Sequence, residues 1–100
     1  MIKHMVMFRI KGVGETKIQN TDKLKDRLDE LKNKISVVRY LETGINISES
    51  KSSFDLVLCT HFDSEHDLDE YRNHTDHQKI VALIKDMVSE VAVVDYFIKY

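Results

Sequence analysis

Apolar and polar residues alternate with a period of two near the start of the chain. One parity is mainly apolar and includes a histidine: Ile2, His4, Val6, Phe8 and Ile10. This alternation predicts a strand over about residues 2–10, which ends at the Gly12-Val13-Gly14 segment. Similar runs predict three further strands over about residues 37–47, 54–62 and 91–100.

Two other regions have the spacing of amphipathic helices. Four apolar residues form the stripe of the first: Leu24, Leu28, Leu31 and Ile35. The residues Asn20, Thr21 and Asp22 offer N-cap chemistry at its expected start. After the third strand we expect a short helix that holds Leu68 and Tyr71. A second helical segment, capped by Thr75 or Asp76, then carries an apolar face: Ile80, Val81, Ile84 and Val88.

The resulting order is βαββαβ, which is the ferredoxin-like α+β arrangement with one antiparallel four-stranded sheet and helices on one face. The strands are apolar on both parities. The last strand, for example, has Val91, Val93 and Phe97 on one side and Ala92, Val94, Tyr96 and Ile98 on the other. Helices cover only one face, so we predict a homodimer whose sheets face each other. The alternative is a monomer with a partly apolar open face.

Composition limits the remaining possibilities. A length of 100 residues favours a single domain over residues 1–100. A formal net charge of −2 gives no electrostatic signature for nucleic acid or for acidic membranes, and no apolar run is long enough to span a bilayer. The single cysteine, Cys59, cannot form an internal disulfide, which favours a reducing cytoplasmic location.

The densest group of reactive side chains lies between residues 71 and 77. Tyr71, His74 and His77 fall within this stretch, and a histidine base beside a tyrosine donor suits enolisation or aldol chemistry. The competing interpretation is structural, with Tyr71 in the core and the imidazoles on a helix surface or at a cap. His74 and His77 also have i, i+3 spacing, but no further ligand has a recognised zinc spacing, so we predict no metal site.

Two isolated polar residues belong to predicted strands. His4 lies on the apolar parity of the first strand and would be one of few polar groups if that face lines a pocket. Asp95 stands among apolar residues of the last strand, and its carboxylate needs a donor such as a backbone N–H or a basic side chain.

Four segments together resemble the stress-responsive A/B barrel domain family. They are Met1-Ile2-Lys3-His4-Met5-Val6, Gly44-Ile45-Asn46 followed by Ser52-Ser53-Phe54-Asp55-Leu56-Val57-Leu58, Tyr71-Arg72-Asn73-His74-Thr75-Asp76-His77, and Val93-Val94-Asp95-Tyr96. The resemblance covers essentially the whole chain and implies a dimeric α+β barrel. Two residues depart from the pattern: Thr75 replaces a common proline, and Leu56 replaces a further pocket histidine of a plant branch.

The resemblance also implies a site. One plant branch of the family cyclises a linear polyketide without a cofactor, and the residues matching Tyr71 and His77 form its acid–base pair. The residue matching His4 lines the same pocket, and we expect His4 and His74 to contact a substrate.

The predicted function is therefore a cofactor-independent cyclase- or isomerase-like enzyme on a small carbonyl or phenolic compound. The alternative is a non-catalytic dimer that binds a small apolar or aromatic ligand or acts in a stress response. Haem-degrading and quinone-forming monooxygenases share the fold, but the chain has no tryptophan and no histidine in a haem-ligand context.

Overall fold

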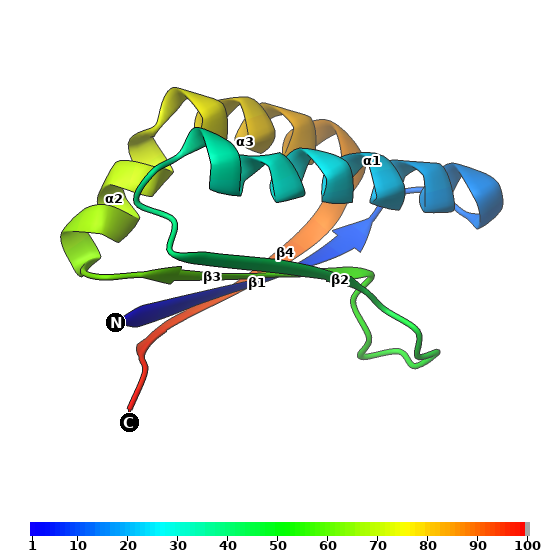
Figure 1. Ribbon diagram of the computed structural model, residues 1–100. Helices are drawn as coiled ribbons and strands as arrows, with labels where there is room; N and C mark the ends of the chain where they lie inside the picture. Colours follow the sequence, from blue (N-terminus) through cyan, green and yellow to red (C-terminus); the bar gives the residue numbers. More distant parts are fainter. Residues whose placement is uncertain (100) are drawn as a thin grey trace.

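The computed structural model describes residues 1–99 and contains one four-stranded antiparallel sheet with helices on one face (Figure 1). The elements occur in the order β1 (Ile2–Ile10), α1 (Gly14–Lys34), β2 (Tyr40–Ile45), β3 (Leu56–Phe62), α2 (Glu65–Asn73), α3 (Thr75–Met87) and β4 (Val88–Phe97). The strand order across the sheet is β2-β3-β1-β4, so β1 and β3 are central and β2 and β4 are edges. The predicted ferredoxin-like fold is confirmed.

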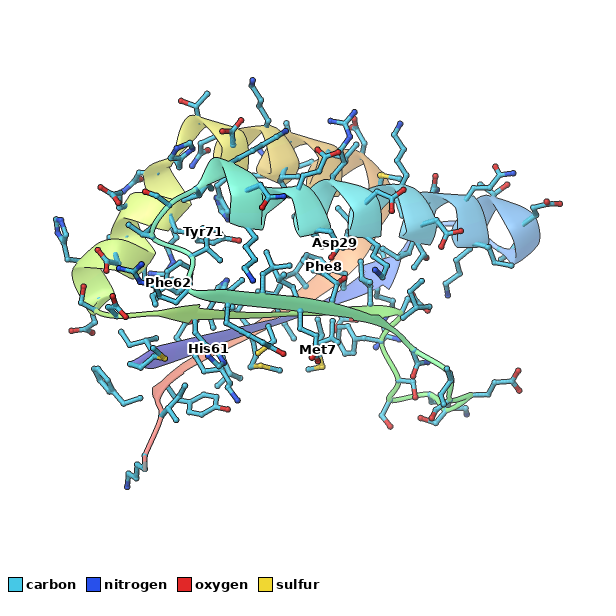
Figure 2. The ribbon with its side chains drawn as sticks, viewed as in Figure 1. Met7, Phe8, Asp29, His61, Phe62 and Tyr71 are labelled. Carbon is cyan, nitrogen blue, oxygen red and sulfur yellow. The ribbon has the colours of Figure 1, made fainter. Side chains whose placement is uncertain are left out.

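The period of two in the sequence determines which side chains face the helices. Burial alternates along β1 and β3, and the even-numbered residues of both strands are buried. They pack against the leucine stripe of α1, of which Leu24, Leu28 and Leu31 are each at most 1% exposed. The core therefore lies between the sheet and the helices, as Figure 2 shows for Phe8, Phe62 and Tyr71.

Several predicted boundaries are corrected. Helix α1 begins at Gly14 and not near Asn20, and its N-cap residue Val13 makes no side-chain cap. Gly12 lies at φ 98°, a conformation that side chains with a Cβ disfavour, so this glycine allows the turn from β1 into α1. Helix α3 is capped by His74, whose ring accepts from the Asp76 backbone N–H, and not by Thr75 or Asp76 themselves.

The last predicted strand is shifted. Strand β4 begins at Val88, three residues earlier than expected, and Tyr100 of the predicted strand lies outside the described residues. Among residues 1–99, no helix is both long and apolar enough to cross a membrane.

The two faces of the sheet differ in their cover. All three helices lie above one face, while His61 and Met7 point away from the helices on the other side (Figures 1 and 2). We call this second side the open face. Strand register aligns three rows across it: Tyr40, His61, Lys3 and Tyr96; Glu42, Cys59, Met5 and Val94; and Gly44, Val57, Met7 and Ala92.

Candidate functional site

A cavity of about 530 Å³ lies between the sheet and the helices. Most of its wall is apolar and comes from β1, β3, β4, α1 and α3, while the polar groups come mainly from the end of α2 and the start of α3. The lining residues are His4, Val6, Phe8, Leu28, Leu58, Tyr71, Arg72, Asn73, His77, Gln78, Ile80, Val81, Ile84, Val91 and Val93. An apolar cavity with a few convergent polar groups is the form expected of a small-molecule site.

The break between α2 and α3 orients His77. Helix α2 ends at Asn73, and the carbonyl of Arg72 in its last turn is free of the helical ladder. That carbonyl accepts from His77 Nδ1 at 3.1 Å and from Gln78 Nε2 at 2.7 Å. A carbonyl oxygen only accepts, so neutral His77 carries its proton on Nδ1 and has a lone pair on Nε2.

The environment of His77 keeps its ring uncharged. Burial lowers the pKa of His77 below its ordinary value. The positive charge of Arg72 lowers this pKa further, as do His4 and His74 when they are protonated. The hydrogen bond with the Arg72 carbonyl opposes this shift without reversing it. The neutral imidazole is therefore the dominant form near pH 7, which is the form that can accept a proton.

The Tyr71 ring lies close to both histidine rings of the cavity. Its ring centroid is 4.6 Å from that of His77 and 6.0 Å from that of His4. The residue is 1% exposed, and burial raises the pKa of its phenol, so the hydroxyl stays protonated. Within residues 1–99 this hydroxyl has no protein hydrogen-bond partner. Its oxygen is nevertheless not completely buried, so another molecule can reach it. It is accordingly available as a donor to a ligand.

His4 is held by the edge strand. Strand register places it directly opposite Asp95 of β4, and its Nδ1 donates to Asp95 Oδ1. The second carboxylate oxygen of Asp95 accepts from Arg72 Nη2 at 2.5 Å. The Asp95 carboxylate was expected to need a donor, and in the structure it has two, His4 Nδ1 and Arg72 Nη2. Neither Asp95 nor Arg72 was predicted as part of the site; the available signal was a carboxylate within an apolar strand.

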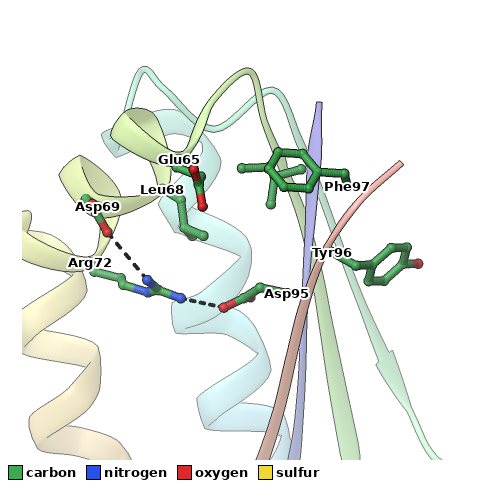
Figure 3. Close-up of a pocket in the computed structure, with 8 residues that line it drawn as sticks. Glu65, Leu68, Asp69, Arg72, Asp95, Tyr96 and Phe97 are labelled. Atoms are coloured by element: carbon green, nitrogen blue, oxygen red, sulfur yellow. Dashed lines mark hydrogen bonds and ion pairs between the residues drawn. The ribbon is translucent and has the colours of Figure 1, made fainter. Parts of the chain in front are cut away.

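A second hollow of about 350 Å³ adjoins the cavity and shares Arg72 with it (Figure 3). We call it the outer groove. Its lining combines apolar side chains with three carboxylates and one guanidinium: Ile2, Glu65, Leu68, Asp69, Arg72, Asp95, Tyr96 and Phe97. Its only basic lining residue is Arg72, which also contacts Asp69 at 3.5 Å.

The predicted site residues separate into two groups. The structure brings Tyr71, His77 and His4 together around one cavity. His74 does not line this cavity; its Nδ1 accepts from the Asp76 N–H at 3.1 Å and caps α3. In the described part of the chain, no three His, Cys, Asp or Glu side chains are grouped so as to hold a metal ion. Leu56 is buried and also lies outside the cavity lining.

Comparison with known proteins gives a family and a set of similar folds. The family model described as the stress responsive A/B barrel domain matches residues 2–98. No significant match is found among curated protein sequences. A dimeric protein of unknown function with a ferredoxin-like fold from Bacteroides fragilis is 28% identical, with a TM-score of 0.83 over 95% of this chain and 93% of that chain.

Two structures with more distant sequences share the fold. A hydroxynitrile lyase from Passiflora edulis is 14% identical, with a TM-score of 0.83 over 98% of this chain and 93% of that chain. An antibiotic biosynthesis monooxygenase is 17% identical, with a TM-score of 0.78 over 100% of both chains. Proteins with different activities therefore use this architecture, and the function has to be argued from the cavity.

Proposed function

Because the chain belongs to the stress-responsive A/B barrel domain family, we propose that its cavity is the acid–base site of a cofactor-independent enzyme acting on a small carbonyl or phenolic compound. One observation carries the proposal. Within residues 1–99, the Tyr71 hydroxyl and His77 Nε2 have no protein partner, and both residues line one cavity. A donor and a base are thus available to the same ligand.

The proposed step is removal of a proton from the carbon beside a carbonyl group. His77 Nε2 takes the proton, the C–H electron pair forms a C=C bond, and negative charge develops on the carbonyl oxygen. The Tyr71 hydroxyl donates a hydrogen bond to that oxygen and stabilises the enolate. Return of the proton to another carbon gives an isomer. Attack of the enolate carbon on a second carbonyl, followed by proton transfer from His77 to the new alkoxide, gives an aldol ring.

The cavity favours a neutral ligand with an apolar body. Apolar side chains from both layers form most of its wall. Its one permanently charged lining residue, Arg72, is already paired with Asp95 and Asp69, so no free cation remains to bind an anionic group. His4, held through Nδ1 by Asp95, presents Nε2 as an acceptor that can orient a phenol hydroxyl. His74 acts in this proposal only as the cap of α3.

Exchange of α-protons with solvent tests the proposed step without knowledge of the natural product. A panel of small apolar ketones and 1,3-diketones is incubated with the protein in D₂O, and deuterium incorporation is followed by proton NMR. We expect exchange faster than with free imidazole. His77→Gln should slow it by about 10²–10⁴-fold, as expected for loss of a general base. Tyr71→Phe, which retains the ring, should slow it by about 10²–10³-fold.

The second candidate function is non-catalytic binding of a small apolar or aromatic ligand. The apolar majority of the cavity wall favours this candidate as well. The same panel distinguishes the two functions. A ligand that perturbs the amide signals of cavity residues, yet shows no exchange above the imidazole control and the same affinity for His77→Gln, would establish binding without catalysis.

We also propose that two copies associate through the open face. The two rows at its centre are mainly apolar, and large side chains there remain exposed, including Met7 at 40% and Val94 at 57%. Polar groups border these rows, with Arg9 paired to Glu90 at one end and Tyr40, His61 and Lys3 at the other. An apolar centre with a polar rim is typical of an interface. The dimeric Bacteroides fragilis structure supports a second copy as the occupant.

Sedimentation tests this assembly. We expect wild-type protein to sediment as a dimer and Met5→Glu to sediment as a monomer, because the carboxylate would be buried without a partner. Ile47→Glu is the matched control, since Ile47 is 98% exposed and lies in the loop after β2. A wild-type monomer, or equal dissociation by both substitutions, would contradict assembly through the open face.

A further inference from the structure

Arg72 is linked to both imidazoles of the cavity through different parts of the residue. Its backbone carbonyl accepts from His77 Nδ1 at 3.1 Å. Its guanidinium donates from Nη2 to Asp95 Oδ2 at 2.5 Å, and the other oxygen of that carboxylate accepts from His4 Nδ1. One position in the last turn of α2 is therefore connected to both rings.

We propose that Arg72 is a positioning residue for this site: its guanidinium fixes the Asp95 carboxylate, and that carboxylate fixes the tautomer and ring orientation of His4. The inference deepens the proposed function, because it explains how the second imidazole is held with its proton on Nδ1 and its lone pair on Nε2. It concerns the arrangement of the site and does not depend on which compound is bound.

The sheet alone leaves the Asp95 carboxylate incompletely held. His4 and Asp95 are opposite residues of the β1–β4 pair, so register brings the two side chains together. Strand β4 is an edge, however, and the Asp95 side chain is 27% exposed at the outer groove. A carboxylate with one hydrogen-bonded oxygen can still rotate about its terminal torsion, which is broad. A donor to the second oxygen fixes its plane.

The outer groove provides one candidate for that donor. Figure 3 shows Arg72 reaching from α2 across the groove to Asp95 on β4. The other charged lining residues are Glu65 and Asp69, whose carboxylates cannot donate when ionised and repel Asp95. Arg72 therefore supplies both the second donor and the charge that offsets these neighbours. Its contact with Asp69 is longer, at 3.5 Å, so Asp95 is the closer partner.

Imidazole NMR tests the proposal directly. Histidine-selective ¹⁵N labelling and long-range ¹H–¹⁵N correlation at pH 7.5 report which ring nitrogen carries the proton. In wild-type protein we expect the Nδ1–H tautomer for both His4 and His77. In Arg72→Met we expect His4 to change to a mixture of tautomers, while His77 keeps Nδ1–H because its partner is the backbone carbonyl.

Matched variants distinguish a specific effect of Arg72 on the His4 ring from a general disturbance of the fold. Asp69→Asn removes the weaker partner of Arg72 and should leave both rings unchanged. Asp95→Ala removes the acceptor of His4 Nδ1 and should release His4 in the same way as Arg72→Met. It provides the test from the other side of the contact if Arg72→Met does not fold. Arg72→Lys keeps the charge but loses the planar fork, so we expect partial retention of the His4 tautomer.

Two results would overturn the proposal. One is an unchanged His4 spectrum in a folded Arg72→Met protein, and the other is an equal change of His4 and His77 in that variant. A His4 ring that keeps a single Nδ1–H form in a folded Asp95→Ala protein would also overturn the proposal. Failure of the proposed function is a separate observation, because absence of α-proton exchange in wild-type protein leaves these tautomer assignments intact.

Discussion

The two faces of one sheet carry different kinds of surface. The helices bury the covered face over β1 and β3 and form the apolar core there, with a cavity where Tyr71, His77 and His4 meet. Along the edge strand β4, however, Val91, Val93 and Phe97 remain exposed on the same face. The open face is apolar at its centre and has no helix over it within the described residues. The same alternation of side chains along β1 produces both surfaces, because successive residues point to opposite sides.

Hydrogen bonding separates the faces further. On the open face, Tyr40 donates to Glu42 at 2.6 Å and Arg9 donates to Glu90 at 2.9 Å, but His61 Nε2 is buried without a partner among residues 1–99. On the covered face, the Tyr71 hydroxyl has no partner in residues 1–99 and opens onto a cavity. An unpaired donor in a largely apolar cavity is costly unless a ligand or water satisfies it. The Tyr71 hydroxyl faces a cavity, and this is the reason for proposing chemistry on the covered face and association on the open one.

The largest expected loss of stability follows from a substitution in the core, and it should differ from a substitution on the open face in its dependence on protein concentration. Leu31→Ala on the covered face should lower the free energy of unfolding by about 2–5 kcal/mol at every protein concentration. Met7→Ala on the open face should cost less than about 1 kcal/mol in dilute protein and more as dimer forms, because association stabilises by mass action. Urea unfolding at two protein concentrations measures both. A concentration-independent loss for Met7→Ala would show that Met7 does not lie in an interface between two copies.

Acid should weaken the fold through a histidine on each face. Burial lowers the pKa of His77 and also that of His61, which lies beside Lys3. Below the unfolded value of about 6.5, the unfolded chain then binds more protons than the folded chain, so stability falls as pH falls. Each histidine contributes at most about 1.4 kcal/mol per pH unit.

Single and double variants assign this acid sensitivity. His77→Gln and His61→Gln should each reduce the slope of unfolding free energy against pH between about pH 6.5 and 5, and the double variant should reduce it most. Urea unfolding at a series of pH values provides the measurement. A slope that neither substitution changes would show that other groups dominate the acid response.

The smallest expected effect concerns the Arg72–Asp95 contact. Both side chains are partly exposed, at 43% and 27%, so Arg72→Met should change the free energy of unfolding by no more than about 1 kcal/mol. A stability loss of several kcal/mol would show that the ion pair holds α2 against β4 and does more than orient a carboxylate. Thermal unfolding at low and high salt is sufficient to decide this.

Much of the fold could be predicted from periodicity. The leucine stripe ending at Leu31 and the alternation of Ile2, Val6 and Phe8 predicted one helix and one strand, and the core confirms both. The start of α1 could not be predicted in this way, because residues 14–20 are mostly polar and lie beyond the apolar stripe. The cap of α3 was assigned to Thr75 or Asp76, since a histidine ring is an uncommon helix cap.

Residues of the candidate site could be predicted from the sequence only where they are close in the chain or share the parity of the core residues. Tyr71 and His77 are separated by one break between helices, and His4 has the parity of the core. The link from Arg72 to Asp95 joins residues 23 positions apart, and that from His4 to Asp95 joins residues 91 apart. These contacts depend on strand register and on where α2 meets the sheet edge, which composition and spacing do not specify.

The covered face holds a neutral base, His77, in a partly open cavity. Titration of the His77 ring by NMR, with His77→Gln for assignment, tests this most directly. The structure predicts a midpoint below about 6.5, the value of an ordinary histidine, with the proton of the neutral ring on Nδ1. A midpoint at or above about 6.5, or a neutral ring protonated on Nε2, would show that His77 is not held as a neutral base with its proton on Nδ1.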